Sequence, residues 1–84
     1  MRLSYSADMP TVLRKDGFRV MIRTHDHEPP HVHCLKSGGE VLIDIEAGHL
    51  RYVDGMKRSD VAKAIALVEE NRALLMREWR KVFP

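Results

Sequence analysis

The sequence predicts an α+β domain in which an antiparallel sheet of four to five strands, made of two hairpins, precedes one long C-terminal helix packed on one face. Three observations carry this prediction. Apolar and polar side chains alternate from residue 11 to residue 53, glycines interrupt the alternation, and apolar side chains recur every three or four positions from residue 60 to residue 82. A chain of 84 residues is too short for two independent cores, so one core is expected.

The first hairpin is predicted from two apolar segments, residues 11–14 and 18–24, on either side of a loop at residues 15–17. The second segment alternates between apolar positions and positions that carry arginine or methionine. A three-residue loop that ends in glycine suits a type I turn with a bulge. This loop would place Val12 opposite Val20.

The second hairpin is predicted over residues 31–36 and 40–46, which flank a segment of one serine and two glycines. Glycine pairs favour two-residue loops, so Gly38-Gly39 is the expected turn. A fifth short strand is expected at residues 49–53.

The two-residue loop has a consequence for the histidines of this hairpin. It places His33 opposite Asp44 and His31 opposite Glu46, on a face separate from the apolar side chains. A three-residue loop over residues 37–39 would instead place both histidines in the apolar layer. The two-residue loop is preferred because it separates apolar from polar side chains. It predicts a surface of histidines and carboxylates on the sheet face opposite the helix.

The helix is predicted from residue 60 to residue 82, with Ser59 as its N-cap. Trp79 belongs to the apolar stripe and is expected in the core. Three basic residues near the end of the helix suit the negative end of its dipole, with a phosphate-binding patch as the less favoured alternative: Arg77, Arg80 and Lys81.

Composition argues against several classes of protein. Fourteen Lys and Arg residues against twelve Asp and Glu residues give a net charge of +2, too weak a bias to indicate a nucleic-acid-binding protein. Cys34 is the single cysteine, so no disulfide forms within the chain, and its side chain is expected to be buried. The apolar segments are too short to span a membrane and no signal-peptide pattern is visible, so a cytoplasmic location is expected.

Four of the five histidines lie within nine residues: His25, His27, His31 and His33. His31 and His33 are two positions apart on a predicted strand, so they share a face and can chelate one metal ion. Asp44 or Glu46 could supply a third ligand. The candidate metal ligands are therefore His27, His31, His33 and Glu46. Nitrogen and oxygen ligands of this kind suit zinc, manganese, nickel or iron.

Two other roles stay open for the same segment. Histidine can act as a general acid or base, and the catalytic candidates are then His31, His33, Asp44 and Glu46. A contact with a partner protein would use His27, Glu28, His31 and His33. Pro29-Pro30 stiffens the segment, and a turn, such as one with a cis bond before Pro30, would be needed to bring all four histidines together.

The heptapeptide His-Glu-Pro-Pro-His-Val-His, residues 27–33, resembles the motif of a family of small uncharacterised bacterial proteins, a domain of unknown function. MPTVLRKDGFRV, residues 9–20, and VEENRALLMREWRKVF, residues 68–83, resemble the start and the closing helix of this family. Its genes often lie beside another small gene, in arrangements that look like toxin–antitoxin pairs or mobile-element cargo. The resemblance therefore implies a protein partner and implies no established chemistry.

Residues 1–8 stand outside this resemblance. They are polar and lack a pattern, so we expect a flexible N-terminal extension followed by a single domain over residues 9–84. Met1 and Met9 are both candidate starts of the protein.

The leading functional hypothesis is a small cytosolic protein-binding module, one member of a toxin–antitoxin-like or mobile-element gene pair. Its partner would be the product of the neighbouring small gene, and a homodimer is an open alternative. The alternative function is a hydrolase that uses a metal ion or histidine acid–base chemistry, such as a ribonuclease-like toxin acting on RNA through residues 27–33. The expected complex tests the first hypothesis, and alanine at His31 and His33 tests the second.

Overall fold

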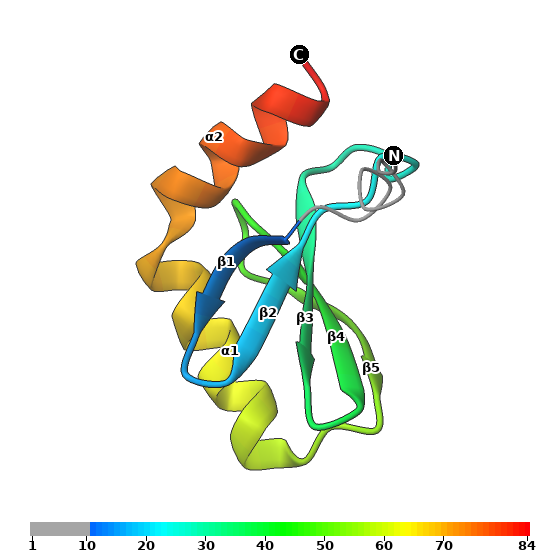
Figure 1. The fold of residues 1–84 in the computed structure, drawn as a ribbon, viewed down its shortest axis with the longest axis vertical. Coiled ribbons are helices and arrows are strands. Elements are labelled where there is room, and N and C mark those ends of the chain that lie inside the picture. The colour runs from blue at the N-terminus through cyan, green and yellow to red at the C-terminus, as the bar shows by residue number, and fades with distance from the viewer. Residues whose placement is uncertain (1–10) are drawn as a thin grey trace, which may run out of the picture.

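The computed structural model describes residues 11–84 (Figure 1). Five strands precede two helices: β1 Thr11–Lys15, β2 Phe18–Met21, β3 His31–Lys36, β4 Gly39–Asp44, β5 Leu50–Asp54, α1 Arg58–Glu70 and α2 Arg72–Val82. Neighbouring strands pair antiparallel in the order β1-β2-β3-β4-β5. The predicted α+β class with an antiparallel sheet is confirmed. The extension predicted over residues 1–8 lies outside the described residues.

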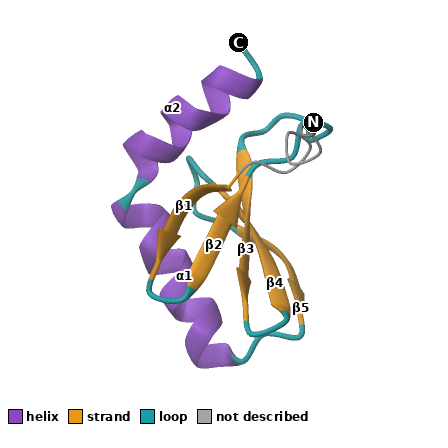
Figure 2. Ribbon diagram, viewed as in Figure 1, coloured by secondary structure: helices purple, strands orange, loops and turns teal. Residues whose placement is uncertain are grey.

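The helices form a second layer beside the sheet (Figure 2). Alternate residues of the central strands point into the apolar core, which is the period-two pattern of a sheet with one buried face. The core contains the following buried side chains: Phe18, Val20, Ile22, Val32, Cys34, Val41, Ile43, Ile45, Met56, Ala64, Leu67, Val68, Leu75 and Trp79. Cys34 and Trp79 are fully buried, as the sequence predicted.

The first hairpin turns through two residues, not three. Asp16 and Gly17 have φ angles of 52° and 84°. Two positive φ angles are typical of a type I′ turn, whose twist matches that of paired strands. As a result Leu13, and not the predicted Val12, lies opposite Val20.

The second hairpin turns at Ser37 and Gly38, one residue before the predicted Gly38-Gly39 loop. The φ angles of these two residues are 51° and 82°. Gly39 begins β4 and packs against another backbone, since a Cβ atom there would lie 2.5 Å from the carbonyl oxygen of Gly55. The two glycines therefore have different uses: Gly38 supplies a left-handed backbone and Gly39 allows a close approach of two chain segments.

The register of β3 against β4 consequently differs from the predicted one by two residues. His33 lies opposite Leu42 and His31 lies opposite Asp44. The predicted pairs of His33 with Asp44 and of His31 with Glu46 are wrong. A shift of two residues keeps every side chain on its predicted face, because side chains alternate with a period of two.

The predicted single long helix is in fact two helices. Between Glu70 and Arg72 the helix is interrupted at Asn71. Asn71 Nδ2 donates a hydrogen bond to the Leu67 carbonyl at 2.8 Å, and the Asn71 backbone N–H is shared between the carbonyls of Leu67 and Val68. Side-chain amides that compete for backbone acceptors disfavour a helix interior, which explains why the break falls at this residue.

The first helix also begins earlier than predicted. Its first residue is Arg58, its N-cap is Lys57 without a side-chain capping bond, and the prediction of Ser59 as N-cap is wrong. Asp60, in the first turn, accepts a hydrogen bond from Lys36 Nζ at 3.3 Å. This carboxylate ties the start of α1 to the end of β3, and its charge suits the positive end of the helix dipole.

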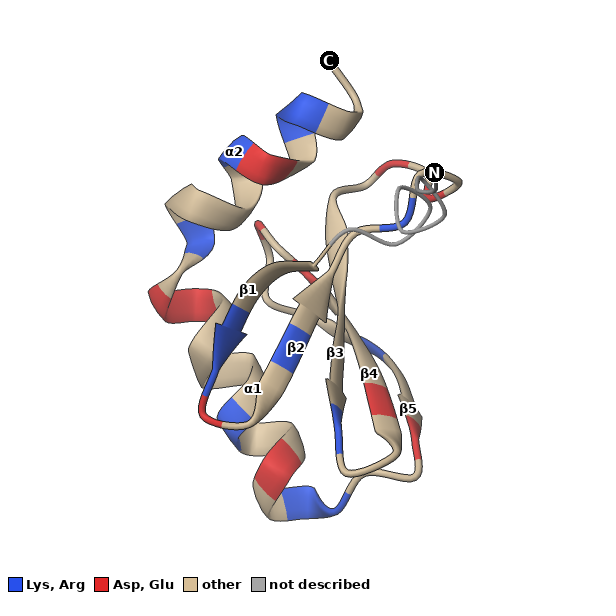
Figure 3. Ribbon diagram, viewed as in Figure 1, with Lys and Arg blue, Asp and Glu red and all other residues tan. Residues whose placement is uncertain are grey.

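Acidic and basic residues are interspersed along the two helices (Figure 3). The last turn of α2 carries Arg80 and Lys81, where the helix dipole favours positive charge. Lys81 also pairs with Glu78 at 3.0 Å. Within the described residues, none of the helices combines the length and the apolar character that crossing a membrane requires.

Candidate functional site

β2 ends at Met21, earlier than predicted, and the segment between β2 and β3 brings Asp26 against His33 of β3. A tight turn holds it: the Arg23 N–H donates to Asp26 Oδ2 at 2.9 Å, and the Asp26 N–H donates to the Arg23 carbonyl at 3.0 Å. The peptide bond between Glu28 and Pro29 is cis, so the cis bond lies before Pro29 and not before Pro30. The turn between Arg23 and Asp26 directs the carboxylate of Asp26 toward the start of β3.

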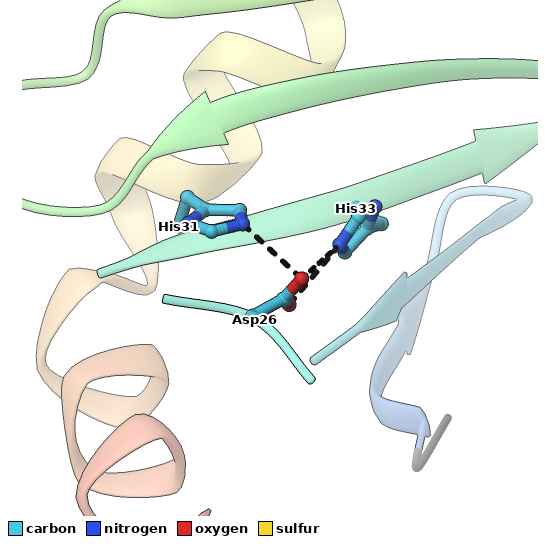
Figure 4. A group of neighbouring side chains, drawn as sticks. All are labelled: Asp26, His31 and His33. Atoms are coloured by element: carbon cyan, nitrogen blue, oxygen red, sulfur yellow. Dashed lines mark hydrogen bonds and ion pairs between the residues drawn. The ribbon is translucent and has the colours of Figure 1, made fainter. Parts of the chain in front are cut away.

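Three side chains meet beneath this segment: Asp26, His31 and His33 (Figure 4). Nε2 of His33 lies 3.1 Å from each carboxylate oxygen of Asp26, and Nε2 of His31 lies 3.4 Å from Asp26 Oδ1. One potential ligand atom from each of the three residues lies within 4.8 Å of the others. The three side chains therefore form a group that can hold one metal ion, and we call it the triad.

The triad is buried rather than exposed on the sheet surface. His31 is 6% exposed and His33 is 4% exposed. Both lie on the predicted face of the sheet, but Asp26, from the covering segment at residues 22–30, lies against both rings (Figure 4). The prediction of a solvent-facing histidine surface is therefore wrong.

Each histidine ring of the triad has its second nitrogen occupied by an acceptor. Nδ1 of His33 lies 2.9 Å from Glu40 Oε2, and Nδ1 of His31 lies 2.9 Å from the Pro29 carbonyl oxygen. A carbonyl or an ionised carboxylate can only accept, so Nδ1 is the donor in both rings. When the rings are neutral, both Nε2 atoms consequently present lone pairs to the carboxylate of Asp26.

This arrangement requires a positive charge between the rings and Asp26. Lone pairs of Nε2 facing carboxylate oxygens at these distances are acceptors facing acceptors, which is unfavourable in a buried site. A proton on Nε2 or one shared metal cation removes the conflict. Protonation of both rings would place two positive charges on centroids 5.6 Å apart, whereas a single cation is shared by all three groups.

The pKa of Asp26 reflects two opposing effects. Desolvation by burial raises it, whereas the Arg23 backbone N–H, the hydrogen bond to His33 and the charges of His33 and His31 lower it. The lowering effects prevail, so the pKa lies below its ordinary value of 3.8. Asp26 is therefore a carboxylate at neutral pH and can serve as an anionic ligand.

The second helix closes one side of the site. The ring of Trp79 lies 5.4 Å from the ring of His31, and Trp79 Nε1 donates to Glu28 Oε2 at 3.3 Å. Phe83 also packs against this indole, with ring centroids 4.4 Å apart. These contacts link the end of α2 to the segment that covers the triad.

An open hollow of about 440 Å³ adjoins the triad. Its lining residues come from the covering segment and from strands β3 to β5: His25, Asp26, His27, Glu28, His31, Leu42, Arg51 and Tyr52. Asp26 and His31 belong both to the triad and to this lining. An ion in the triad would consequently be reached from the hollow.

The structure brings together only part of the residue set predicted from the sequence. His31 and His33 meet, whereas His27 is exposed and Glu46 lies exposed in the turn after β4. Glu28 bonds to Trp79, as described above. Asp44 pairs with Arg51 at 3.4 Å instead of with a histidine.

Two groups of the candidate site were missed, the Asp26 carboxylate and the Glu40 carboxylate that contacts His33. Asp26 lies between two histidines of the motif region, and this alternation was the one available signal. Glu40 pairs across the ladder with Leu35, which places it one step diagonally from His33 on the same face. Only the observed register reveals that contact.

Comparison with known proteins identifies a family but no characterised relative. The family model described as "Domain of unknown function (DUF4160)" matches residues 17–80, which is more than half of the chain. No curated protein matches, and no solved structure matches. This chain therefore belongs to the DUF4160 family of domains of unknown function.

Proposed function

We propose that this domain binds one divalent transition-metal ion through Asp26, His31 and His33 and uses it in a hydrolytic reaction. The observation that carries the proposal is the convergence of both Nε2 atoms on one carboxylate, with each Nδ1 committed to an acceptor. Metal-binding histidines in proteins commonly have this second hydrogen bond, which fixes the ring and its tautomer.

The ligand set favours metals that accept nitrogen and oxygen donors, namely zinc, manganese, nickel or iron. Asp26 takes the place of the third ligand, which the sequence analysis assigned to Asp44 or Glu46. A divalent ion held by three protein ligands supplies Lewis acidity and keeps open coordination positions. The hollow gives a substrate access to that side of the triad.

The remaining chain supports this chemistry in two ways. Glu40 and the Pro29 carbonyl hold the rings in one orientation, which reduces the reorganisation needed when an ion binds. His25 and His27 border the hollow, and imidazole groups at such positions can transfer protons in hydrolysis.

Metal content is the decisive measurement. Protein without a histidine tag, purified without chelators, is analysed by elemental mass spectrometry and then titrated with zinc after chelator treatment. We expect one equivalent of metal per chain, and loss of binding in Asp26→Asn and His33→Ala. His49→Ala is the matched control, because His49 is exposed and lies outside the triad. Trp79 fluorescence and circular dichroism check that each variant is folded.

Less than about a tenth of an equivalent, with no zinc uptake on titration, would contradict the proposal. The triad would then be a buried, proton-stabilised ion cluster. Equal loss of metal in His49→Ala would also count against it, because the metal would then be bound at the surface.

A protein-binding module is the second candidate function. Within residues 11–84, the large apolar side chains that are exposed lie together on the edge strand β5: Leu50, Tyr52 and Val53. An edge strand has unpaired backbone groups that can add a strand from a partner. Gel filtration with the product of the neighbouring small gene tests this role: a complex that Val53→Asp weakens favours it, and separate elution of the two proteins argues against it.

A further inference from the structure

The hollow beside the triad has walls of different chemistry. The covering segment supplies His25, His27 and Glu28, and the strands supply Arg51 and Tyr52. Its volume of about 440 Å³ falls in the range of sites for small ligands, roughly 300–1,000 Å³. The hollow is open to solvent, so it can also admit one unit of a longer chain.

The charge of the hollow depends on the ion in the triad. Its lining holds two carboxylates, Asp26 and Glu28, and one guanidinium, Arg51, which together carry one negative charge. A divalent ion changes this total to one positive charge. Including Asp44, which pairs with Arg51, lowers the charge by one unit both with and without the ion. A metal-free triad that carries one proton on Nε2 is still one unit less positive than a triad that holds a divalent ion, so the ion favours an anion in the hollow.

Arg51 is placed to share an anion with the ion. Its Nη1 atom lies 3.4 Å from Asp44 Oδ1, and its side chain is 38% exposed. Asp44 thus holds the guanidinium at the wall of the hollow, and within residues 11–84 it is the one ion-pair partner of Arg51. A guanidinium matches the oxygens of a phosphate group with two parallel hydrogen bonds.

Tyr52 supplies an aromatic surface on the same wall. It is 51% exposed and lies opposite Leu42, on the sheet face that carries the triad histidines. Exposed aromatic rings beside a phosphate site are platforms on which nucleobases stack.

We infer that the hollow binds the phosphate ester of a nucleotide, with the phosphate between the triad ion and Arg51 and the base against Tyr52. This inference rests on the proposed metal site and names its ligand class. A free nucleotide and one unit of a single-stranded nucleic acid offer the same chemistry, and the experiment distinguishes them.

The test uses tag-free protein in zinc-loaded and metal-free forms, with adenosine monophosphate and a fluorescently labelled oligoadenylate as probes. We expect zinc to tighten binding of the preferred probe at least tenfold. Arg51→Gln should weaken it by about tenfold, whereas Arg14→Gln, on the other edge strand, should leave it unchanged. Tyr52→Leu should weaken it about fivefold or more, and Tyr52→Phe should retain it.

Comparable affinity for the two probes identifies a free nucleotide, and a tighter, salt-sensitive affinity for the oligoadenylate identifies a single strand. Zinc-loaded protein that binds neither probe overturns this inference and leaves the metal site standing. Equal losses in Arg51→Gln and Arg14→Gln overturn it as well. If the protein takes up no metal, the proposed function fails first, and this inference fails with it.

Discussion

Nδ1 of His33 lies 2.9 Å from Oε2 of Glu40, and this contact makes His33 a ring with a single orientation. The same Glu40 oxygen lies 3.6 Å from a guanidinium nitrogen of Arg23. Arg23 also donates its backbone N–H to Asp26, so the two carboxylates around His33 share one neighbouring residue. Glu40 is therefore a positioning residue for the triad, acting through His33.

The first prediction concerns Glu40→Gln. Glutamine keeps the shape of the side chain but removes the charge that favours a proton on His33 Nδ1. Loss of such an outer contact typically weakens metal affinity by about 10–100-fold. We expect a zinc affinity weakened by about that factor, measured by competition with a chromogenic chelator, while the metal stoichiometry stays at one.

The matched control for this prediction is Glu46→Gln. Glu46 is exposed in the turn after β4 and does not belong to the triad. The affinity of the Glu46→Gln protein for zinc should therefore equal that of the unmodified protein. An effect of Glu46→Gln as large as that of Glu40→Gln would mean that general surface charge, rather than the contact with His33, controls affinity.

Half of the candidate site could be predicted from the sequence. His31 and His33 are two positions apart on a strand, so they share one face in any register. Their proximity therefore did not depend on where the hairpin turns. Asp26 depends on a loop turn whose hydrogen bonds to Arg23 form only when β2 ends early. The contact of Glu40 with His33 depends on the register of β3 against β4. That register differs from the predicted one because the hairpin turns at Ser37-Gly38 instead of Gly38-Gly39.

The second prediction concerns acid stability of the metal-free protein. The pKa of Asp26 is lowered in the folded state, so its ionised form stabilises the fold above the unfolded pKa, and this contribution is lost as pH falls through the folded pKa. The difference in free energy of unfolding between the unmodified protein and Asp26→Asn should shrink from about pH 5.5 to about pH 3. Urea unfolding followed by Trp79 fluorescence measures it. If the difference in free energy of unfolding instead grew as the pH fell over this range, the result would contradict a lowered pKa of Asp26.

The fold was more predictable than the turns that connect it. Alternation along β3 and β4 survives a two-residue error in register, so the core face was correct although the cross-strand partners were not. The apolar stripe of residues 60–82 continues past Asn71 and outweighed the weak helix propensity of asparagine, so the side-chain bond to Leu67 that interrupts the helix was not predicted. Local hydrogen bonds of this kind are decided by the folded geometry.

The third prediction concerns the close contact at Gly39. A Cβ atom at Gly39 would lie 2.5 Å from the Gly55 carbonyl oxygen, and this neighbour is backbone that cannot rotate away. Gly39→Ala should lower the free energy of unfolding by about 1–3 kcal/mol, as overpacking does elsewhere. Gly38→Asn is the control, because Gly38 has open space around it and asparagine tolerates its positive φ. Equal stability of Gly39→Ala and the unmodified protein in urea would show that β4 and the Gly55 turn separate freely.

The fourth prediction uses Cys34 as a reporter of both folding and metal binding. Burial raises the pKa of the Cys34 thiol to about 12, and the side chain is fully buried, so the reactive thiolate is scarce and inaccessible in the folded protein. A thiol reagent at about pH 8 should therefore label the native protein far more slowly than the urea-unfolded protein. A ligand that binds only the folded state reduces the unfolded fraction, so zinc should slow labelling further. Asp26→Asn should abolish this effect of zinc without making the native thiol reactive. Rapid labelling of the native protein would show that the sheet opens at β3, and slowing by zinc in Asp26→Asn would place the metal outside the triad.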